Sequence, residues 1–523
     1  MKKLSYIFCG LMIFTLQACF NLDLDPLDKV TEASYFKTRE DFDGATFAAY
    51  SSWQKLYQIR QAMPNVNFSE WIRLSNLVDD AVEGVLFETQ QGMREDVREL
   101  DELDFRPTFQ SIQAIYAYVY EGIMRANTII EKVEEENELT DAEKKAFRAE
   151  AKFIRGFLHF QALKLWGTPP LVLKRITDVN EASQPNASQE DLYKSILADF
   201  EEAYTNLPES WDSNNLGRAS KWTAKAFMGK VNVWKKDWPA AIADFEAIEK
   251  AGAYQLMVDY EDVFAADNQN NAESIFEIQA GVIPGENNPW IGEDEGSGHG
   301  EGNQRAYFNG ICRRVPPNRI LQDSQGNEAS IQSIGIFEAS PAFVAKFEAG
   351  DLRKEVSVYF DGDVYYNLDG AEVLYEPFRT DYTISQTGHH IKKYNGRRSV
   401  TPDGPFDGRT VINNERFYRY AEMILLYAEA LIEQGREAEA LVQINRIRAR
   451  AGLGESTLNA TAALHHEKHM ELAFEGQRFF DVVRWGIGAQ VYGEKWTDKV
   501  VLFPFPQAEV ARSGGLLKQN IGY

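Results

Sequence analysis

The chain contains 523 residues, 44% of them hydrophobic, which is enough to bury a sizeable core in one large domain or more. Its 79 Asp and Glu residues against 55 Lys and Arg residues give a formal net charge of −24 at pH 7. Nucleic acid is therefore excluded as a partner, because binding to its phosphates depends on clustered Lys and Arg.

The first element in chain order is an apolar run from Leu4 to Leu16 that follows two lysines. A helix that spans a bilayer needs about 20 apolar residues, whereas this run has the length of a secretory signal. It ends in the motif LQAC, which resembles the lipobox of bacterial lipoproteins, where the cysteine becomes the first residue and carries acyl chains such as palmitate. We therefore predict a lipoprotein signal peptide over residues 1–18, lipidation at Cys19 and a lipidated tether over residues 19–38. An ordinary cleaved signal with an incidental cysteine is the alternative.

Cysteine is rare, and its three positions restrict how the fold can be held together. Cys9 lies in the signal and Cys19 would carry lipid, which leaves Cys312 alone in the mature chain. No disulfide can form within that chain, so its stability must come from the core. Cys312 has no designated base beside it, and we interpret it as a packing or loop-lining residue.

Apolar residues at three- and four-residue spacings predict amphipathic helices along much of the chain. The first is the stretch EDFDGATFAAYSSWQKLYQI, which begins at Glu40. Further helices are predicted near residues 108–136, 141–166, 189–206, 222–234, 238–250, 417–433, 436–450 and 460–475.

The middle of the chain, residues 255–415, has a different composition, rich in Gly, Asn, Pro and Asp. The short apolar runs SIFEIQ and VSVYF, which begin at Ser274 and Val356, predict strands. One stretch, SPAFVAKFEAG from Ser340, predicts a helix within this segment.

Two of the predicted helix pairs share one spacing of small and apolar residues. Small residues at the first two positions let two antiparallel helices approach closely, and the apolar residues fill the seam between them. This spacing resembles the tetratricopeptide repeat. Generic helical hairpins are the alternative, and both interpretations predict a helical scaffold. The first pair carries Gly229, Ala241, Phe245 and Ile248, and the second carries Ala428, Ala440, Ile444 and Ile447.

Several longer stretches together resemble one known family. They are FRAEAKFIRGFLHFQALKLWGTPPLV, YAEMILLYAEALIEQGREAEALVQINRIRARAGL, HEKHMELAFEGQRFFDVVRWG and the terminal LFPFPQAEVARSGGLLKQNIGY. These stretches, with the lipobox and the NLDLDP that follows it, resemble the SusD/RagB-like (starch-utilisation system D-type) outer-membrane lipoproteins of Bacteroidetes. The resemblance covers nearly the whole mature chain and weakens over residues 255–415.

The resemblance implies a mainly α fold: a tetratricopeptide-like helical repeat scaffold with a loop-rich insertion containing short β-strands. We expect one domain over residues 39–523, with the scaffold in residues 39–254 and 416–523 and an irregular, ligand-binding insertion in residues 255–415. It further implies a non-enzymatic, cofactor-free lipoprotein, exposed on the cell surface and anchored in the outer membrane, that binds an oligosaccharide or polysaccharide. The expected protein partner is a SusC-like TonB-dependent transporter, which would take up the glycan as a nutrient.

Enzyme motifs are incomplete in this sequence, and we predict neither catalytic nor metal-binding residues. The stretch HHEKHME is one residue short of the zincin motif, and the i,i+4 pair His465 and His469 has no evident third ligand. The glycine-rich residues 292–302 lack the Gly-Lys-Ser/Thr of a phosphate-binding loop. A surface-attached glycoside hydrolase or peptidase and a structural lipoprotein without a ligand remain the alternative functions.

A sugar-binding site needs exposed aromatic planes bordered by hydrogen-bonding side chains. Trp290 lies in PGENNPWIGEDEG, where no apolar period predicts burial, and Trp71 lies among Asn and Asp in NFSEWIRLSNLVDDA. The nearby stretch NQRAYFNG adds further candidates. The predicted glycan-binding residues are Trp71, Trp290, Arg305, Tyr307, Phe308 and Asn309.

The glycan itself is left open by the sequence. Net negative charge mildly disfavours polyanionic glycans, although salt screens this repulsion beyond about 8 Å. The basic clusters CRRVPPNR and IKKYNGRR keep a uronic acid or a sulfate as an alternative to a neutral oligosaccharide.

Overall fold

A computed structural model describes residues 35–57, 81–83, 100–280 and 413–523. Between 303 and 394 it describes residues 303, 305, 309–311, 314–315, 319–320, 322–327, 335, 337–366, 372–379 and 382–394. The predicted signal peptide, Cys19 and all but the last four residues of the predicted tether lie outside these ranges, as does Cys312. The described chain is mostly helical, as the sequence predicts, and no helix in it is long and apolar enough to cross a membrane.

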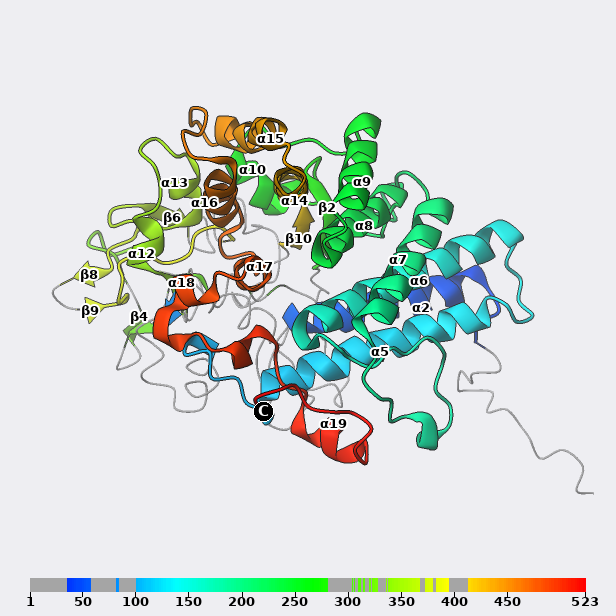
Figure 1. Ribbon diagram of the computed structural model, residues 1–523. Helices are drawn as coiled ribbons and strands as arrows, with labels where there is room; N and C mark the ends of the chain where they lie inside the picture. The colour runs from blue at the N-terminus through cyan, green and yellow to red at the C-terminus, as the bar shows by residue number, and fades with distance from the viewer. Residues whose placement is uncertain are drawn as a thin grey trace, which may run out of the picture.

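The amino-terminal part of the scaffold consists of long helices that follow one another closely. Each of the pairs α5–α6, α6–α7, α7–α8 and α8–α9 is in contact, and α2 packs on α5 and α6 (Figure 1). Local signals set their starts: Thr38 and Thr140 form capping boxes with Asp41 and Glu143. The bounds are α2 (Arg39–Gln54), α5 (Gln110–Lys132), α6 (Asp141–Trp166), α7 (Gln189–Asn206), α8 (Lys221–Lys235) and α9 (Trp238–Ala251), with the 3-10 turns η1 (Lys55–Tyr57) and η3 (Val179–Glu181).

The carboxy-terminal part of the chain completes the same scaffold. Helix α14 packs against α8 and α9, so the two halves form one stack although the middle segment separates them in sequence (Figure 1). The final segment is tied to α6, because Trp166 Nε1 donates to the carbonyl of Pro504 at 3.0 Å. The bounds are α14 (Tyr420–Glu433), α15 (Glu437–Arg450), α16 (Ala460–Leu472), α17 (Arg478–Trp485), α18 (Gly488–Tyr492), η7 (Gly493–Lys495), η8 (Asp498–Val501) and α19 (Gln507–Arg512).

The predicted tetratricopeptide-like pairs are α8–α9 and α14–α15. Gly229 permits the close approach in the first pair, since a Cβ atom there would lie 2.3 Å from Cε1 of Phe245. Ala428 and Ala440 take the small positions of the second pair, and both are fully buried. The structure therefore confirms the predicted packing of these helices.

The middle segment carries short strands that pair two at a time among the described residues. Strand β2, the predicted SIFEIQ strand, pairs antiparallel with β10 and so attaches the segment to the start of α14. The bounds are β1 (Ala81–Glu83), α10 (Tyr260–Phe264), η4 (Ala266–Asn268), β2 (Ser274–Ile278), β3 (Arg314–Val315), β4 (Arg319–Ile320), β5 (Phe337–Ala339), α12 (Pro341–Val344), α13 (Arg353–Ser357), β6 (Val364–Tyr366), β7 (Glu372–Leu374), β8 (Phe378–Arg379), β9 (Tyr382–Thr383) and β10 (Glu415–Arg419).

Three predicted elements need correction. The helix expected from residue 417 begins at Tyr420, because residues 415–419 pair with β2 as a strand. The strand expected in VSVYF is wrong: its first two residues end α13, and Val358 makes only an isolated bridge to Ile391. The helix expected over 460–475 ends at Leu472.

Aromatic rings fill the centre of the core, where the scaffold meets β2 and β10. Phe157 of α6 contacts Phe276 of β2 and Phe417 of β10 edge-on, with ring centroids 5.5 and 5.1 Å apart. Trp53 of α2 packs on Phe157 and Phe417 from the other side and is 2% exposed, as its helical period predicts. The β2–β10 pair thus belongs to the main core and carries the middle segment on it.

Candidate functional site

The structure describes only part of the predicted glycan site. Trp71, Trp290, Tyr307 and Phe308 lie outside the described residues, and their assignment to the site stays a prediction. Arg305 and Asn309 are described, and both are fully buried.

The described ends of three segments meet around Arg305 and Glu415, at a place that we call the loop hub. The segment with Trp71 starts after Tyr57, the segment with Trp290 runs from Ala280 to Asn303, and a third runs from Tyr394 to Asn413. We define the hub as Tyr57, Ala280, Asn303, Arg305, Tyr394, Asn413, Asn414 and Glu415.

Short contacts hold the hub residues together. Asn303 Nδ2 donates to Glu415 Oε2 at 3.2 Å, and the backbone N–H of Ala280 donates to Asn414 Oδ1 at 2.7 Å. The Arg305 guanidinium lies over the Tyr394 ring, 4.9 Å from its centroid. The charges of Glu415 and Arg305 also act on Tyr57, which places this residue near them. The described ends of the segments that carry Trp71 and Trp290 therefore lie near one another, although Tyr57 and Asn303 are far apart in sequence.

Arg305 forms a bidentate pair with Glu415 that explains its burial. Its Nε donates to Glu415 Oε2 at 2.7 Å and its Nη2 to Oε1 at 2.6 Å, while Nη1 donates to the carbonyl of Phe474 at 3.0 Å. Burial lowers the pKa of Arg305, but the Glu415 carboxylate outweighs this effect and holds that pKa above its ordinary value. Through these contacts the Arg305 side chain holds its own segment against β10 and the end of α16. Direct contact between Arg305 and glycan stays a prediction.

Burial also keeps the two hub tyrosines neutral. It raises the pKa of Tyr57 and of Tyr394 well above 10, and the nearby Glu415 carboxylate acts in the same direction. Neutral phenols can donate hydrogen bonds but cannot act as bases near pH 7. Both tyrosines are almost fully buried, so they belong to the packing of the hub.

A buried ionic network lies next to the hub and joins β10 to α16. Arg419 pairs with Glu475 at 2.7 Å and with Glu471 at 3.0 Å, and it also contacts Glu273. Lys393, from the IKKYNGRR cluster, donates to Glu475 at 2.6 Å. Burial lowers the pKa of Lys393 to about 8 despite this partner. Lys393 therefore pairs with a carboxylate inside the protein. It is not available to bind an anion as part of the predicted basic cluster.

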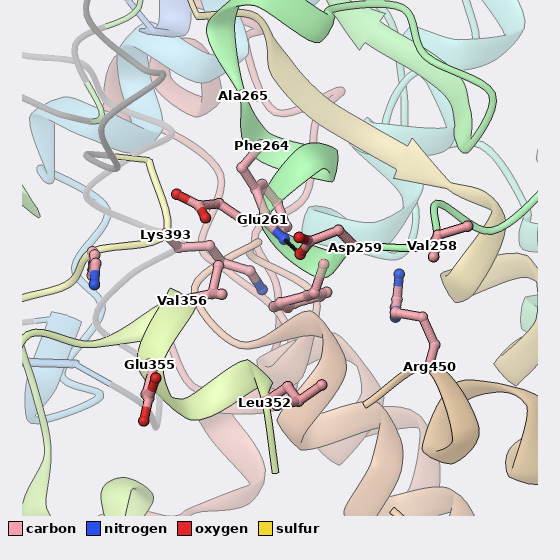
Figure 2. Close-up of a pocket in the computed structure, with 12 residues that line it drawn as sticks. Val258, Asp259, Glu261, Phe264, Ala265, Leu352, Glu355, Val356, Lys393 and Arg450 are labelled. Atoms are coloured by element: carbon pink, nitrogen blue, oxygen red, sulfur yellow. Dashed lines mark hydrogen bonds between the residues drawn. The ribbon is translucent and has the colours of Figure 1, made fainter. Parts of the chain in front are cut away.

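A cavity of about 460 Å³ opens between α10, α13 and α15 (Figure 2). Its walls combine apolar side chains with Lys392, Lys393 and Arg450, and three carboxylates also line it. None of the lining residues is Ser, Cys or His, whereas carboxylates and lysines, which can also act as bases or nucleophiles, are present. The cavity has the size of a small-molecule site, for which about 300–1,000 Å³ is typical.

Two histidines of HHEKHME, His465 and His469, pack against aromatic rings. The His465 ring stacks on Trp485 with centroids 3.9 Å apart, whereas the His469 ring packs against Phe343 at 5.5 Å. The two imidazoles at the i,i+4 spacing therefore pack against different aromatic side chains.

Another group, Glu348, His466 and Glu467, brings three possible metal ligands within 4.8 Å of one another. Arg448 contacts both carboxylates, at 2.6 Å from Glu348 and 2.5 Å from Glu467, and Arg353 pairs with Glu467 at 2.9 Å. Guanidinium groups thus already neutralise the acids, which leaves little attraction for a divalent cation.

Sequence reasoning missed Glu415, the partner of Arg305, because their pairing spans 110 residues and no local pattern connects them. It also missed the cavity, whose walls come from three separate stretches of the chain. The one available signal was the charge of the IKKYNGRR cluster, two residues of which, Lys392 and Lys393, line the cavity.

Comparison with known proteins gives two family matches that together cover most of the chain. The SusD family matches residues 272–501, and a family described as "Starch-binding associating with outer membrane" matches residues 34–233. SusD-like protein P2 of Formosa agariphila is 25% identical over the full length of both chains. The starch-binding protein SusD of Bacteroides thetaiotaomicron is 23% identical over 82% of each chain.

Solved structures share the fold. A laminarin-binding SusD-like protein superposes with a TM-score of 0.76 at 22% identity, covering 93% of this chain and all of that one. Surface glycan-binding protein A from Bacteroides thetaiotaomicron, in complex with laminarihexaose, gives a TM-score of 0.73 at 23% identity and covers 92% of this chain. The two family matches, the relatives and the shared fold agree, and together they show a SusD/RagB-type protein.

Proposed function

We propose that this protein binds an oligosaccharide or polysaccharide at the cell surface, through side chains on the segments that leave the loop hub. The observation that carries the proposal is the meeting, around Arg305 and Glu415, of the ends of the segments that contain Trp71 and Trp290. Relatives named for binding starch and laminarin support the class of ligand.

The delivery step follows from the family. A SusC-like TonB-dependent transporter would receive the glycan, and the lipidated Cys19 would hold the protein on the outer membrane beside that transporter. The description of one matched family as associating with the outer membrane supports this location. More than one acyl chain gives stable attachment, so lipid at Cys19 would suffice as an anchor.

We infer that the protein is not an enzyme. The relatives are named as binding proteins. A surface glycoside hydrolase is the rival function. Purified protein incubated with starch and laminarin should release no new reducing ends, and steady release would overturn the inference.

A calorimetric screen tests the binding function directly. Starch and laminarin oligosaccharides serve as neutral probes, and glucuronate- or sulfate-containing oligosaccharides serve as anionic ones. We expect the neutral probes to bind more tightly, because the net charge of −24 repels polyanions at short range. A flat response to every probe would overturn glycan binding, and anionic binding alone would reverse the ligand class.

Trp290 gives the sharpest mutational test. If its ring stacks on sugar, Trp290→Ala should weaken binding by about 2 kcal/mol or more and leave the thermal midpoint nearly unchanged. A core tryptophan would instead cost about 3–5 kcal/mol of folding stability. The matched control is Phe378→Ala on β8, which removes an aromatic ring that is 59% exposed and lies outside the hub. Unchanged affinity would remove Trp290 from the site, and Trp71→Ala would then be tested in the same way.

A further inference from the structure

A short strip of backbone, residues 389–392, joins two parts of the middle segment, and we call it the His390 strip. On one side the N–H of Ala339 donates to the carbonyl of His389 at 2.7 Å, which attaches the strip to β5. On the other side the N–H of Tyr359 donates to the carbonyl of His390 at 2.9 Å. The strip therefore holds β5 against the residues that follow α13.

Strand β5 in turn carries β1. Among residues 58–99, which contain Trp71, the structure describes only the three residues of β1. Val82 of β1 lies opposite Glu338 of β5, and Glu338 forms an antiparallel bridge to His390. The backbone thus runs from β1 through β5 to the His390 strip, so the docking of β1 depends on that strip.

The His390 side chain is fully buried and has a hydrogen-bond partner on one of its two ring nitrogens. Its Nδ1 lies 2.8 Å from Oη of Tyr375, whereas Nε2 has no hydrogen-bond partner among the described residues. A neutral imidazole suits this environment, because its second nitrogen carries no proton when Nδ1–H donates to Tyr375. A protonated ring would place both a positive charge and an unpaired N–H in the interior, which is unfavourable.

The groups that face His390 leave this conclusion unchanged. Burial lowers the pKa of His390 below its ordinary 6.5, although the Glu338 carboxylate acts in the opposite direction. That carboxylate already accepts hydrogen bonds from the N–H and Oγ1 of Thr387, both at 2.9 Å. Burial also raises the pKa of Tyr375 and of Tyr359, so both phenols stay neutral. Further charged groups nearby act on these two tyrosines, namely Glu261, Asp361, Asp363 and Lys392.

We propose that His390 is an acid-sensitive switch, in which a proton on the imidazole weakens the attachment of the strip to β5 and so loosens β1. When the strip opens, its imidazole meets water and takes up a proton with an ordinary pKa, whereas the closed strip resists that proton. Closure is therefore at full strength above about pH 6.5 and weakens as the pH falls below this value. The consequence for glycan binding, a lower affinity in mild acid, rests on the proposed function; the loosening of β1 does not.

Hydrogen exchange at pH 7.5 and pH 5.5 tests the switch on the full mature protein without ligand. One pH unit below 6.5 raises the open fraction about tenfold, so amides of the strip, β5 and β1 should exchange about tenfold faster at pH 5.5, after correction for intrinsic rates. Amides of β2 and β10 should change less. His390→Asn, which is uncharged and keeps an amide near Tyr375, should abolish the difference. The matched control is His389→Asn at the neighbouring, half-buried position, where the difference should remain.

Two results of the exchange experiment would overturn the proposal. The first is equal corrected exchange of the strip at both pH values in the unmodified protein. The second is faster exchange in acid that persists in His390→Asn, because it would come from another group, such as the buried His159 of α6, whose pKa burial lowers to about 3. If His390→Asn fails to fold, His390→Gln takes its place. The comparison of the strip with β2 and β10 needs no variant.

Glycan affinity separates the switch from the proposed function. Starch and laminarin oligosaccharides should bind the unmodified protein more weakly at pH 5.5 than at pH 7.5, and should bind His390→Asn equally at both. The expected exchange response without binding of any probe would defeat the proposed function and leave the switch standing. Binding with the same pH dependence in both proteins would overturn the link between His390 and the glycan site.

Discussion

The helical scaffold and the middle segment differ in how far they rely on buried charge, although ion pairs such as Lys230 with Glu422 are buried within the scaffold too. In the scaffold, α8 meets α9 and α14 meets α15 through small residues and apolar seams, as at Gly229 and Phe245. The middle segment is attached to this scaffold through buried charge pairs, such as Arg353 with Glu467 and Lys393 with Glu475, as well as through the aromatic contacts of β2. The largest fully buried side chains accordingly include Arg305, Arg353, Arg416 and Arg419 beside the expected aromatics.

The difference matters because the two kinds of contact have different consequences. Apolar seams add stability roughly in proportion to the buried area and tolerate small shifts. A buried ion pair adds little net stability, since desolvation offsets the attraction, but a displaced partner leaves an uncompensated charge in the interior. We therefore expect the charge pairs to determine where the middle segment docks, while the helices supply most of the folding free energy.

Removal of one buried charge should give the largest effect. Arg353 is 0% exposed and pairs with Asp351 at 2.7 Å and with Glu467 at 2.9 Å. Arg353→Ala would leave the buried Asp351 without its ion pair and Glu467 with Arg448 alone, so we expect the free energy of unfolding to fall by about 3–5 kcal/mol in urea denaturation. The control is Arg512→Ala, which breaks a pair to Glu509 whose arginine is 70% exposed and should cost less than about 1 kcal/mol. Equal losses of stability in the two variants would contradict the expectation that a buried ion pair matters more for folding than an exposed one.

Acid should act on the same charge network. Burial raises the pKa of Glu471, but Arg450, Arg419 and Arg353 outweigh burial and lower this pKa to about 2, against 4.5 when unfolded. The stabilisation is therefore present above pH 4.5 and is lost as the pH falls from 4.5 toward 2, by on the order of 3 kcal/mol. Urea midpoints measured between pH 7 and pH 2.5 should follow this course. Glu471→Gln should be less stable at pH 7 and show a shallower dependence below pH 4.5; an equally steep dependence would assign the effect to other acids.

An apolar seam of the scaffold should respond more mildly. Gly229→Ala would place a Cβ atom 2.3 Å from Cε1 of Phe245, an overlap that the helix pair must relieve by moving. Overpacking costs about 1–3 kcal/mol and the better helix propensity of Ala returns about 1, so we expect a net loss of about 1–2 kcal/mol in urea. Phe245→Leu in the same chain should recover part of it. Gly454→Ala is the control, since nothing lies within 4 Å of a Cβ atom there.

The fold could be predicted from the sequence where local residues determine an element, and not where a partner distant in sequence determines it. The bounds of α6 agree with the predicted 141–166 because its start and end are marked locally, by Thr140 with Glu143 and by Gly167. The start of α14 could not be placed, because Tyr418 pairs with Phe276 of a distant strand and that pairing overrides the helical period.

The site was predicted less well for the same reason. Arg305 lies in a polar stretch that resembles a binding loop, and only its pairing with Glu415, 110 residues away, reveals that it is buried. Burial of a charge depends on a partner that local periodicity does not identify. The aromatic candidates Trp71 and Trp290 rest on composition alone and stay predictions.

The smallest effect should come from a contact that is local in sequence. Thr140 begins α6: its Oγ1 accepts from the N–H of Glu143 at 3.3 Å, and the Glu143 carboxylate accepts from the N–H of Thr140 at 2.9 Å. Both bonds lie at the surface. Thr140→Ala should therefore cost about 1 kcal/mol in urea denaturation, whereas Thr140→Ser, which keeps the hydroxyl, should cost almost nothing.

Hydrogen exchange separates this local role from a wider one. In Thr140→Ala, faster exchange should be confined to the first turn of α6, and amides of the β2–β10 pair should exchange as before, because the hydrogen bonds of the cap join Thr140 and Glu143 to each other. Faster exchange in both places would mean that the start of a scaffold helix also supports the docking of the middle segment. That result would contradict the distinction between scaffold helices, whose ends are set by local sequence, and a middle segment whose position is set by charge pairs between residues far apart in sequence.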